Sequence, residues 1–332
     1  MYNKTVKTLW SLCLSLLLLL PQTTRAADDF KLTLSPVFLN AATNPGEAVT
    51  SNIKVTNGGS TETTLTVGVM KFRAFDDSGR PELLDMEPND EYAKWISFSP
   101  SELTLAPGRS AQVAVTFAPP KEAALGYYYA VTFRRAGAPP APIGQETQLL
   151  GTAAVLALLE VKSPDTARNL AAVKFSTDRR WYDFLPVKFN VTLQNTGNIH
   201  LAPRGNIFID KGARTDLAVL DINKAYGNIL PGASRSFTTD WTDGFPVRQD
   251  GKLRWNLSDL PKLRWGKYTA HLVMVYDNGQ QDVPVEAAIS FWVIPWQIIL
   301  AALGVILLLY LGLRSIFKGL RSRFRRQPPA QS

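Results

Sequence analysis

The densest group of chemically active side chains is acidic. Seven carboxylates fall within residues 76–91, with Arg80 the only base among them. Calcium binds several oxygen ligands on a flexible loop, so this run is a candidate calcium site. We favour a solvated acidic loop instead, because the spacing matches no known calcium loop. The candidate ligands are Asp76, Asp77, Glu82 and Asp85. We expect no other metal and no cofactor.

Catalytic constellations are missing from the sequence. His200 and His271 are the only histidines, and they have no zinc-type spacing. A serine hydrolase needs a base and an orienting carboxylate beside its nucleophile, and no Gly-x-Ser-x-Gly elbow occurs. We therefore predict that the chain is not an enzyme.

The N-terminus has the features of a secretory signal. Lys4 and Lys7 precede the apolar run Leu9–Leu20, and small residues stand on either side of Arg25. We predict a signal peptide over residues 1–26. The only cysteine, Cys13, lies inside it, so the mature chain has no thiol for disulfides or zinc.

An apolar run of 23 residues, Phe291 to Leu313, predicts a membrane-spanning helix. Such a helix is about 35 Å long, enough for a hydrocarbon core of about 30 Å. Basic residues beside a span stay in the cytoplasm. We therefore expect a single-pass plasma-membrane protein with an outer N-terminus, a cytoplasmic tail over 314–332 and contacts from that tail to anionic lipid. The basic residues are Arg314, Lys318, Arg321, Arg323, Arg325 and Arg326.

Net charge does not indicate nucleic-acid binding. Of the formal +8, three charges lie in residues 1–26 and six in residues 314–332. The part between them is nearly neutral, so we expect no nucleic acid partner.

Short alternating segments dominate the outer part of the chain. Residues 31–34, 51–56, 64–69, 111–117 and 127–133 alternate apolar and polar side chains between Pro-Gly and Asn-Gly turns. This pattern is typical of antiparallel strands with one buried face. We predict an all-β fold of two tandem immunoglobulin-like sandwiches, residues 27–162 and 163–290, plus one C-terminal transmembrane helix.

An internal repeat supports two related domains. Asn57-Gly, Pro107-Gly and Gly126-Tyr-Tyr in the first half match Asn195-Thr-Gly, Pro231-Gly and Gly266-Lys-Tyr in the second. Asn and Gly are expected to supply positive φ at turns. Tyr128 and Tyr268 suit the tyrosine corner, where a hydroxyl ties a loop to the sheet.

Residues 148–161 form a long, almost entirely apolar strand, expected to pair with residues 127–133. As an edge strand it would invite pairing with another chain. A strand buried inside the sandwich is the favoured alternative, because the apolar run is continuous. The side chains proposed to meet a partner are Leu149, Leu150, Val155 and Leu156.

The layout resembles bacterial surface proteins of the WxL-interacting type. The resemblance covers nearly the whole mature chain and rests on Trp95–Pro100, Leu105-Ala-Pro-Gly, Asn195–Pro203 and the Pro295-Trp296 entry to the span. It implies membrane-anchored tandem immunoglobulin-like domains, the first binding peptidoglycan and the second a surface partner.

The first domain is also similar to PapD-type chaperones, which have Leu-x-Pro-Gly turns of the same kind. We expect a non-enzymatic scaffold at the cell surface that engages peptidoglycan or another surface protein, in an oligomeric state that the sequence leaves open. The alternative is a membrane-tethered assembly chaperone that uses strand 148–161.

Overall fold

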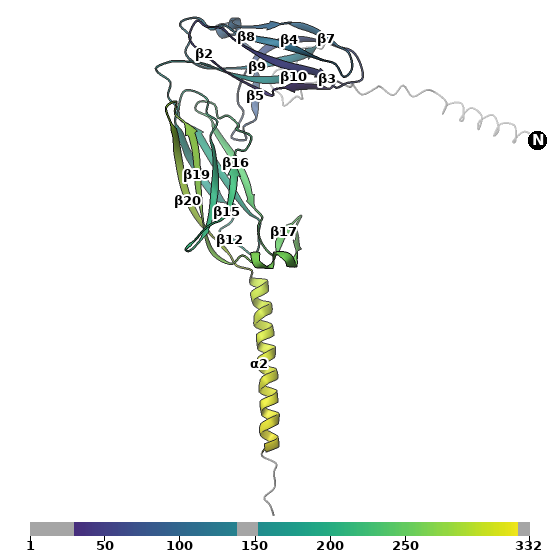
Figure 1. The fold of residues 1–332 in the computed structure, drawn as a ribbon, viewed down its shortest axis with the longest axis vertical. Coiled ribbons are helices and arrows are strands. Elements are labelled where there is room, and N and C mark those ends of the chain that lie inside the picture. The colour runs from purple at the N-terminus through teal and green to yellow at the C-terminus, as the bar shows by residue number, and fades with distance from the viewer. Residues whose placement is uncertain (1–29, 138–151, 325–332) are drawn as a thin grey trace, which may run out of the picture.

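The computed structural model describes residues 30–137 and 152–324. Two β-sandwiches follow one another, and a long helix, α2 (Trp296–Phe324), extends from the far end of the second (Figure 1). The all-β prediction with two immunoglobulin-like domains and a C-terminal apolar helix is confirmed. The predicted signal peptide lies outside the described residues.

Two sheets build the first sandwich, in the strand orders β1-β3-β8-β6 and β2-β10-β9-β4-β5, with β7 also paired to β4. Across the first sheet, β1, β3, β8 and β6 correspond to strands A, B, E and D of an immunoglobulin domain. Across the facing sheet, β10, β9 and β4 correspond to strands G, F and C. The bounds are β1 (Leu32–Ser35), β2 (Phe38–Thr43), β3 (Val49–Asn57), β4 (Thr63–Ala74), β5 (Pro81–Leu84), β6 (Ile96–Ser99), β7 (Glu102–Leu105), β8 (Ser110–Phe117), β9 (Leu125–Arg135) and β10 (Thr152–Val161), with a 3-10 turn η1 (Glu91–Trp95).

Alternation of side chains explains the first core. On β3, Ile53 and Val55 are fully buried while Asn52 and Lys54 face solvent, as expected of a strand with one buried face. The expected pairing of the last strand with residues 127–133 is confirmed, because β10 runs antiparallel to β9 along its whole length.

The second sandwich repeats this order with fewer strands. Its sheets are β11-β13-β16 and β12-β20-β19-β14-β15. The bounds are β11 (Leu170–Thr177), β12 (Trp181–Tyr182), β13 (Val187–Asn195), β14 (Arg204–Lys211), β15 (Arg214–Ile222), β16 (Ser234–Trp241), β19 (Gly266–Asp277) and β20 (Asp282–Val293). An insertion between β16 and β19 holds the hairpin β17 (Val247–Gln249) and β18 (Lys252–Arg254) and a 3-10 turn η2 (Leu257–Lys262).

The repeated asparagines have equivalent positions but a different role from the one predicted. Asn57 and Asn195 are 1% and 0% exposed at the ends of β3 and β13. Asn57 Nδ2 donates to the carbonyls of Thr61 and Leu105, at 2.8 and 2.9 Å, and Asn195 makes the corresponding pair of bonds. Neither has positive φ. Each amide instead ties the loop that follows its strand to a neighbouring loop.

The tyrosine corner of the first domain is one residue away from the predicted position. Tyr268 Oη accepts from Trp265 N at 3.1 Å, as expected. In the first domain Tyr127 makes the equivalent contact, accepting from Ala124 N at 3.4 Å. The prediction for Tyr128 is therefore wrong. It aligned Gly126 at the start of β9 with Gly266 at the start of β19, whereas the residue of β9 that has positive φ like Gly266 is Leu125.

Helix α2 begins five residues later than the apolar run. Phe291 and Val293 are 0% and 1% exposed and end β20 in the second core. Phe291 packs edge-on against Trp241 with ring centroids 6.1 Å apart. Phe291 and Val293 are apolar because they fill this core, whereas Trp292 between them is exposed and stacks on Trp181. The apolar stretch long enough to cross a membrane is Trp296–Lys318.

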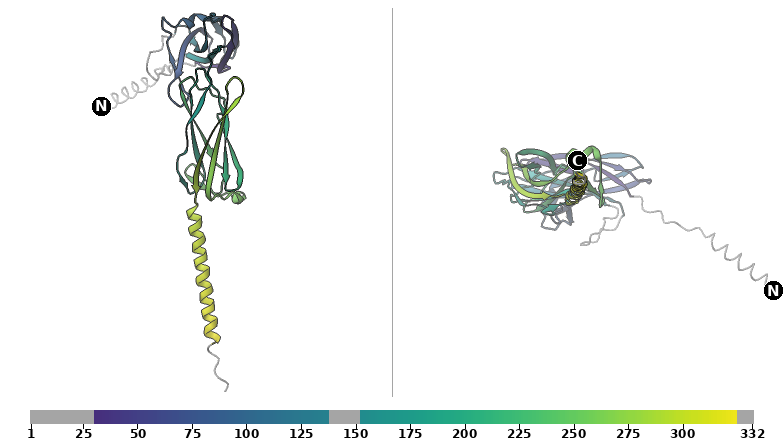
Figure 2. Two further views of the ribbon diagram at one scale, coloured as in Figure 1. Left: turned by 90° about the vertical axis from the view of Figure 1, so that its left-hand side faces the viewer. Right: turned by 90° about the horizontal axis from the view of Figure 1, so that it is seen from below.

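The strands of the first sandwich run across those of the second (Figures 1 and 2). The connecting residues are held by the loop after β13. Asn198 Oδ1 accepts from Ala167 N and Asn198 Nδ2 donates to Asp165 O, both at 2.8 Å. Arg168 pairs with Glu160 of β10 at 2.5 Å. The linker is therefore fixed to both domains.

Replacing Asn57 by alanine removes the amide that donates to the Thr61 and Leu105 carbonyls, the second of these bonds being buried. We expect the Asn57→Ala chain to lose about 2–4 kcal/mol of unfolding free energy in its first domain. Urea denaturation followed by near-ultraviolet circular dichroism measures this loss. Asn52→Ala, an exposed position on the same strand, is the matched control. Equal loss in both variants would contradict the role given to the amide.

Candidate functional site

A cleft of about 90 Å³ lies where the two sandwiches meet, with room for several water molecules. The first domain contributes β2, β10 and the β4–β5 hairpin, and the second contributes the loop before β16 and its first residues. The lining residues are Phe38, Phe72, Arg73, Ala74, Gly79, Arg80, Pro81, Leu156, Leu158, Asn228, Ile229, Leu230, Ala233, Ser234 and Arg235.

The first-domain wall of the cleft is apolar. Leu156 and Leu158 lie on the face of β10 opposite its core side chains, and Phe72 of β4 lies beside them. Leu158 and Phe72 are nearly covered, at 2% and 9% exposed, whereas Phe38 at the start of β2 is 46% exposed. An exposed aromatic ring beside covered leucines offers apolar area to a partner.

One hairpin closes the cleft from the side. The tip of the β4–β5 hairpin reaches the free edge of β16, where Asp77 O accepts from Ser236 N at 2.5 Å. Ser236 Oγ donates to Asp77 Oδ2 at 2.7 Å. A strand edge normally exposes unpaired backbone groups, so this contact both satisfies the edge and fixes the angle between the domains.

Arg235 fills the corner of the cleft. A Cβ on Gly79 would collide with its Nε, and one on Gly227 would come within 2.6 Å of its Cζ. Its Nη1 donates to Asn228 O at 2.9 Å. The guanidinium therefore lies between Gly79 of the first domain and Gly227 of the second. It fits in this position because neither glycine has a side chain.

Three arginines line the cleft, and among the described residues Arg235 is the one of them that has no carboxylate partner. Arg73 pairs with Glu82 at 2.6 Å and Arg80 with Asp76 at 3.7 Å. Burial lowers the pKa of the Arg235 guanidinium from its ordinary value, but an arginine stays charged in proteins. The cleft therefore carries one positive charge that nothing in the described chain neutralises.

Strand β10 is not a free edge along its whole length. Leu156–Val161 pair in parallel with β2 on one side, while β9 pairs on the other. For these residues the edge-strand hypothesis is wrong and the favoured alternative, a strand inside the sandwich, holds, because the segment that follows Pro36 crosses from the first sheet to cover them. Between residues 152 and 155, no described strand pairs on the β2 side.

The four predicted partner residues do not share one environment. Val155 is fully buried in the first core, so its side chain cannot meet a partner. Leu156 faces the cleft. Leu149 and Leu150 lie outside the described residues.

The acidic residues at 76–85 do not gather around one point. Asp76 lies near Arg80, Asp77 binds Ser236, and Glu82 pairs with Arg73. Across residues 30–137 and 152–324 no three His, Cys, Asp or Glu side chains form a group fit for a metal ion. Pairing with arginines and with the second domain accounts for Asp76, Asp77 and Glu82, and we do not propose a calcium site there.

The two histidines lie far apart in the second domain. His271 Nε2 is 3.3 Å from Asp210 Oδ2, with a half-exposed side chain. His200 packs edge-on against Tyr128 of the first domain, with ring centroids 5.8 Å apart. His200 therefore belongs to the domain junction.

Of the residues that line the cleft, the sequence analysis named only Leu156 as a partner-binding residue. Phe38, Phe72 and Arg235 stand in ordinary strand patterns, and only the fold brings them together. Gly227 offered a usable signal, because a glycine without positive φ often marks the close approach of another chain segment. Gly79 did not, because its positive φ in the turn of the β4–β5 hairpin already accounts for a glycine there.

No family model matches the chain, and no curated protein matches it. Solved structures are similar in fold. The Pseudomonas aeruginosa CupB2 chaperone is 14% identical over 79% of this chain and 100% of that one, with a TM-score of 0.33. The CsuC–CsuE chaperone–tip adhesion subunit complex of Acinetobacter baumannii gives 11% identity over 77% and 97%, with a TM-score of 0.34. The Salmonella enterica SafA pilin in complex with the SafB chaperone gives 10% over 80% and 99%, with a TM-score of 0.34. Because these TM-scores are below 0.5, the immunoglobulin-like assignment rests on the strand order of the chain itself.

Burial lowers the pKa of His200 from its ordinary value, so the folded chain favours the neutral imidazole. Its contribution to stability is therefore complete above about pH 6.5 and is lost as the pH falls below that value, since the unfolded chain binds the proton more tightly. We expect the thermal midpoint of the chain to fall between pH 7 and pH 5, and His200→Gln to flatten this slope. Differential scanning calorimetry at a series of pH values measures it. If the thermal midpoint depends on pH equally in the unaltered chain and in His200→Gln, His200 is not the cause of the pH dependence.

Proposed function

We propose that this chain is a membrane-anchored, non-enzymatic protein that holds an extended segment of another surface protein at its domain junction, as an assembly chaperone or scaffold. One observation carries the proposal. On its β2 side, Thr152–Val155 pairs with no strand among residues 30–137 and 152–324, and this edge continues directly into an apolar cleft whose wall includes Leu156 and Phe38. A strand edge supplies backbone affinity, and adjoining apolar pockets supply selectivity for alternate side chains.

An added strand would lie in line with β2. Residues 152–155 extend β10 past the start of β2, and Val37 and Phe38 at that start are 65% and 46% exposed. A segment with alternating apolar residues would pair with the edge and cover these side chains. Arg235 would attract an anionic group of the partner, because its charge is half-buried and unneutralised.

The apolar wall favours a polypeptide over a glycan. The resemblance to WxL-interacting proteins implies peptidoglycan binding by the first domain, but Leu156, Leu158 and Phe72 beside a strand edge suit the alternate side chains of an added strand. Two of the chaperones reported above, CsuC and SafB, are named in complexes with a tip adhesion subunit and a pilin. At their TM-scores that likeness carries no weight, and the proposal rests on the cleft.

Helix α2 is the proposed anchor. Its apolar side chains are exposed on every side, Leu303, Leu307 and Leu308 by 55–70%, and such a surface is stable only in an apolar medium. Arg314 and Lys318 lie in the last residues of the stretch Trp296–Lys318, and Arg321 and Arg323 fall near the helix end. Arg325 and Arg326 lie outside the described residues. We propose that this basic end is cytoplasmic and both sandwiches lie outside.

A photocrosslinker at position 152 of the full chain tests the binding edge in cells. We expect a crosslink to an extracytoplasmic protein, mapped by mass spectrometry to a segment that alternates apolar and polar residues. Phe38→Asp should reduce the crosslink strongly, because it places a charge in the cleft, whereas Val219→Asp, which is similarly exposed on β15 of the second domain, should not. A crosslink spread over many proteins, or unaffected by Phe38→Asp, would refute the proposed edge.

A further inference from the structure

The β17–β18 hairpin lies at the end of the second domain from which α2 leaves (Figure 1). This hairpin and η2, which follows it, carry an apolar and basic surface. We call it the basal platform and define it by Lys252, Arg254, Trp255, Leu257 and Leu260. Trp255 is 56% exposed, Leu257 75% and Leu260 54%. Side chains this large and this exposed mark an interaction surface when they cluster.

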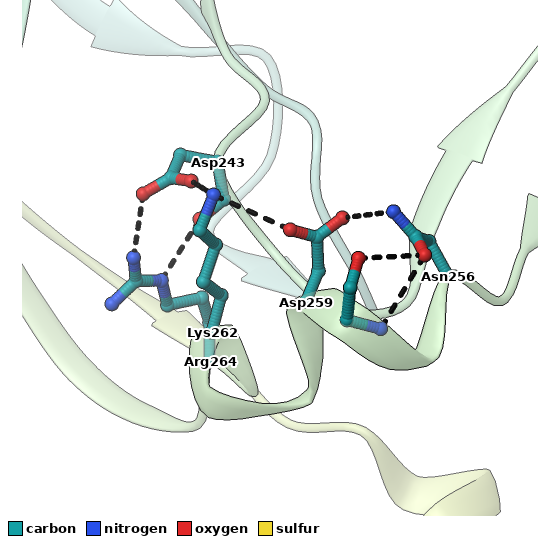
Figure 3. Close-up of polar contacts among 6 residues, drawn as sticks. Asp243, Asn256, Asp259, Lys262 and Arg264 are labelled. Atoms are coloured by element: carbon teal, nitrogen blue, oxygen red, sulfur yellow. Dashed lines mark hydrogen bonds and ion pairs between the residues drawn. The ribbon is translucent and has the colours of Figure 1, made fainter.

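Polar contacts below the platform hold it in place (Figure 3). Lys262 Nζ is 2.8 Å from Asp243 Oδ1 and 3.4 Å from an oxygen of Asp259. Arg264 Nη2 also binds Asp243, at 2.7 Å. Asn256 accepts from Ser258 N and donates to Asp259, so it fixes the first turn of η2. This network neutralises its own acids and leaves Leu257 and Leu260 facing solvent.

Packing also fixes the tryptophan of the platform. The Trp255 ring lies edge-on to Phe245 at 5.7 Å and to Phe184 at 6.5 Å between centroids. More than half of the ring remains exposed. A rigid, half-exposed indole is typical of a membrane interface, where one part of the ring is apolar and the other hydrated.

The start of α2 is joined to the hairpin of the platform. Asp183 Oδ2 accepts from Arg248 of β17 at 2.7 Å and from Gln297 of the first helical turn at 3.3 Å. Trp296, at the first position of α2, is 53% exposed. If α2 crosses a bilayer from this point, the platform lies at the level of the lipid headgroups.

The charge of the platform suits an anionic surface. Lys252 and Arg254 are exposed and have no ion pair in the described part of the chain, unlike Arg248, Lys262 and Arg264. A surface that combines free cations with exposed tryptophan and leucine is the pattern of protein segments that lie in a membrane interface.

We propose that the basal platform docks on the outer surface of the same bilayer that α2 crosses, with Trp255, Leu257 and Leu260 inserted among the lipids and Lys252 and Arg254 on anionic headgroups. This inference rests on the membrane anchor of the proposed function. A single helix leaves an attached domain free to tilt, whereas a second contact beside it holds the second sandwich upright and the cleft at a fixed height above the membrane.

Lipid quenching of a fluorophore in the full chain tests this proposal. Leu257→Cys, Val219→Cys and Leu307→Cys, each with Cys13→Ser, are labelled with an environment-sensitive dye and reconstituted in nanodiscs. The discs contain phosphatidylcholine alone or mixed with phosphatidylglycerol, with a nitroxide lipid as quencher. All three positions are exposed, so the label leaves the fold intact. We expect the dyes at 257 and 307 to lose most of their fluorescence and the dye at 219 to keep it.

The charge contribution is measured in the same system. With Lys252→Glu and Arg254→Glu together, quenching at 257 should fall in discs that contain phosphatidylglycerol and change little in phosphatidylcholine discs. Quenching at 307 but none at 257 would refute membrane docking by the platform while supporting α2 as the anchor. No quenching at 307 would refute both the anchor and the docking. A dye at 257 that is shielded from aqueous iodide but not quenched by the nitroxide lipid would show that the platform is covered by protein. That result would refute docking on the bilayer.

Discussion

The contact between the tip of the β4–β5 hairpin and the edge of β16 is the constraint on which the rest of the structure depends. Backbone and side-chain bonds join Asp77 to Ser236, and Arg235 enters the space that Gly79 and Gly227 leave open. A hairpin from one domain thus caps a strand edge of the other. Without this contact the cleft would have no fixed second wall, because that wall belongs to a different domain.

The consequence is a preformed cleft, so the proposed binding site would not have to be assembled on binding. The linker adds its own bonds through Asn198, and the Arg168–Glu160 pair joins it to β10. Binding to a rigid surface avoids the entropy cost of ordering two domains. The same reasoning extends to the membrane, where α2 and the basal platform together would set the height and direction of the cleft.

Local patterns predicted the fold well because each depends on neighbours in the sequence. Alternation on β3 and β8 and the Pro-Gly turns, with Gly108 and Gly232 at positive φ, identified both sandwiches. The aligned asparagines identified the repeat, although their amides bond loop carbonyls instead of forming a positive-φ turn.

The site itself could not be predicted in this way, because its parts are distant in the sequence. Nothing in residues 152–161 indicates that the segment after Pro36 covers half of that strand. The same holds at the domain end, where Phe291 and Val293 look like membrane residues but belong to a core that contains Trp241. Apolar composition alone does not distinguish a buried strand from the start of a span.

The angle between the domains tests the account most directly. Pulsed electron paramagnetic resonance between spin labels at positions 52 and 219, one exposed site on each sandwich, reports the distance distribution in the full chain. The account predicts a single narrow distribution that broadens when Asp77→Ala and Ser236→Ala remove the side-chain part of the hairpin contact. A broad distribution in the unaltered chain would contradict a preformed cleft.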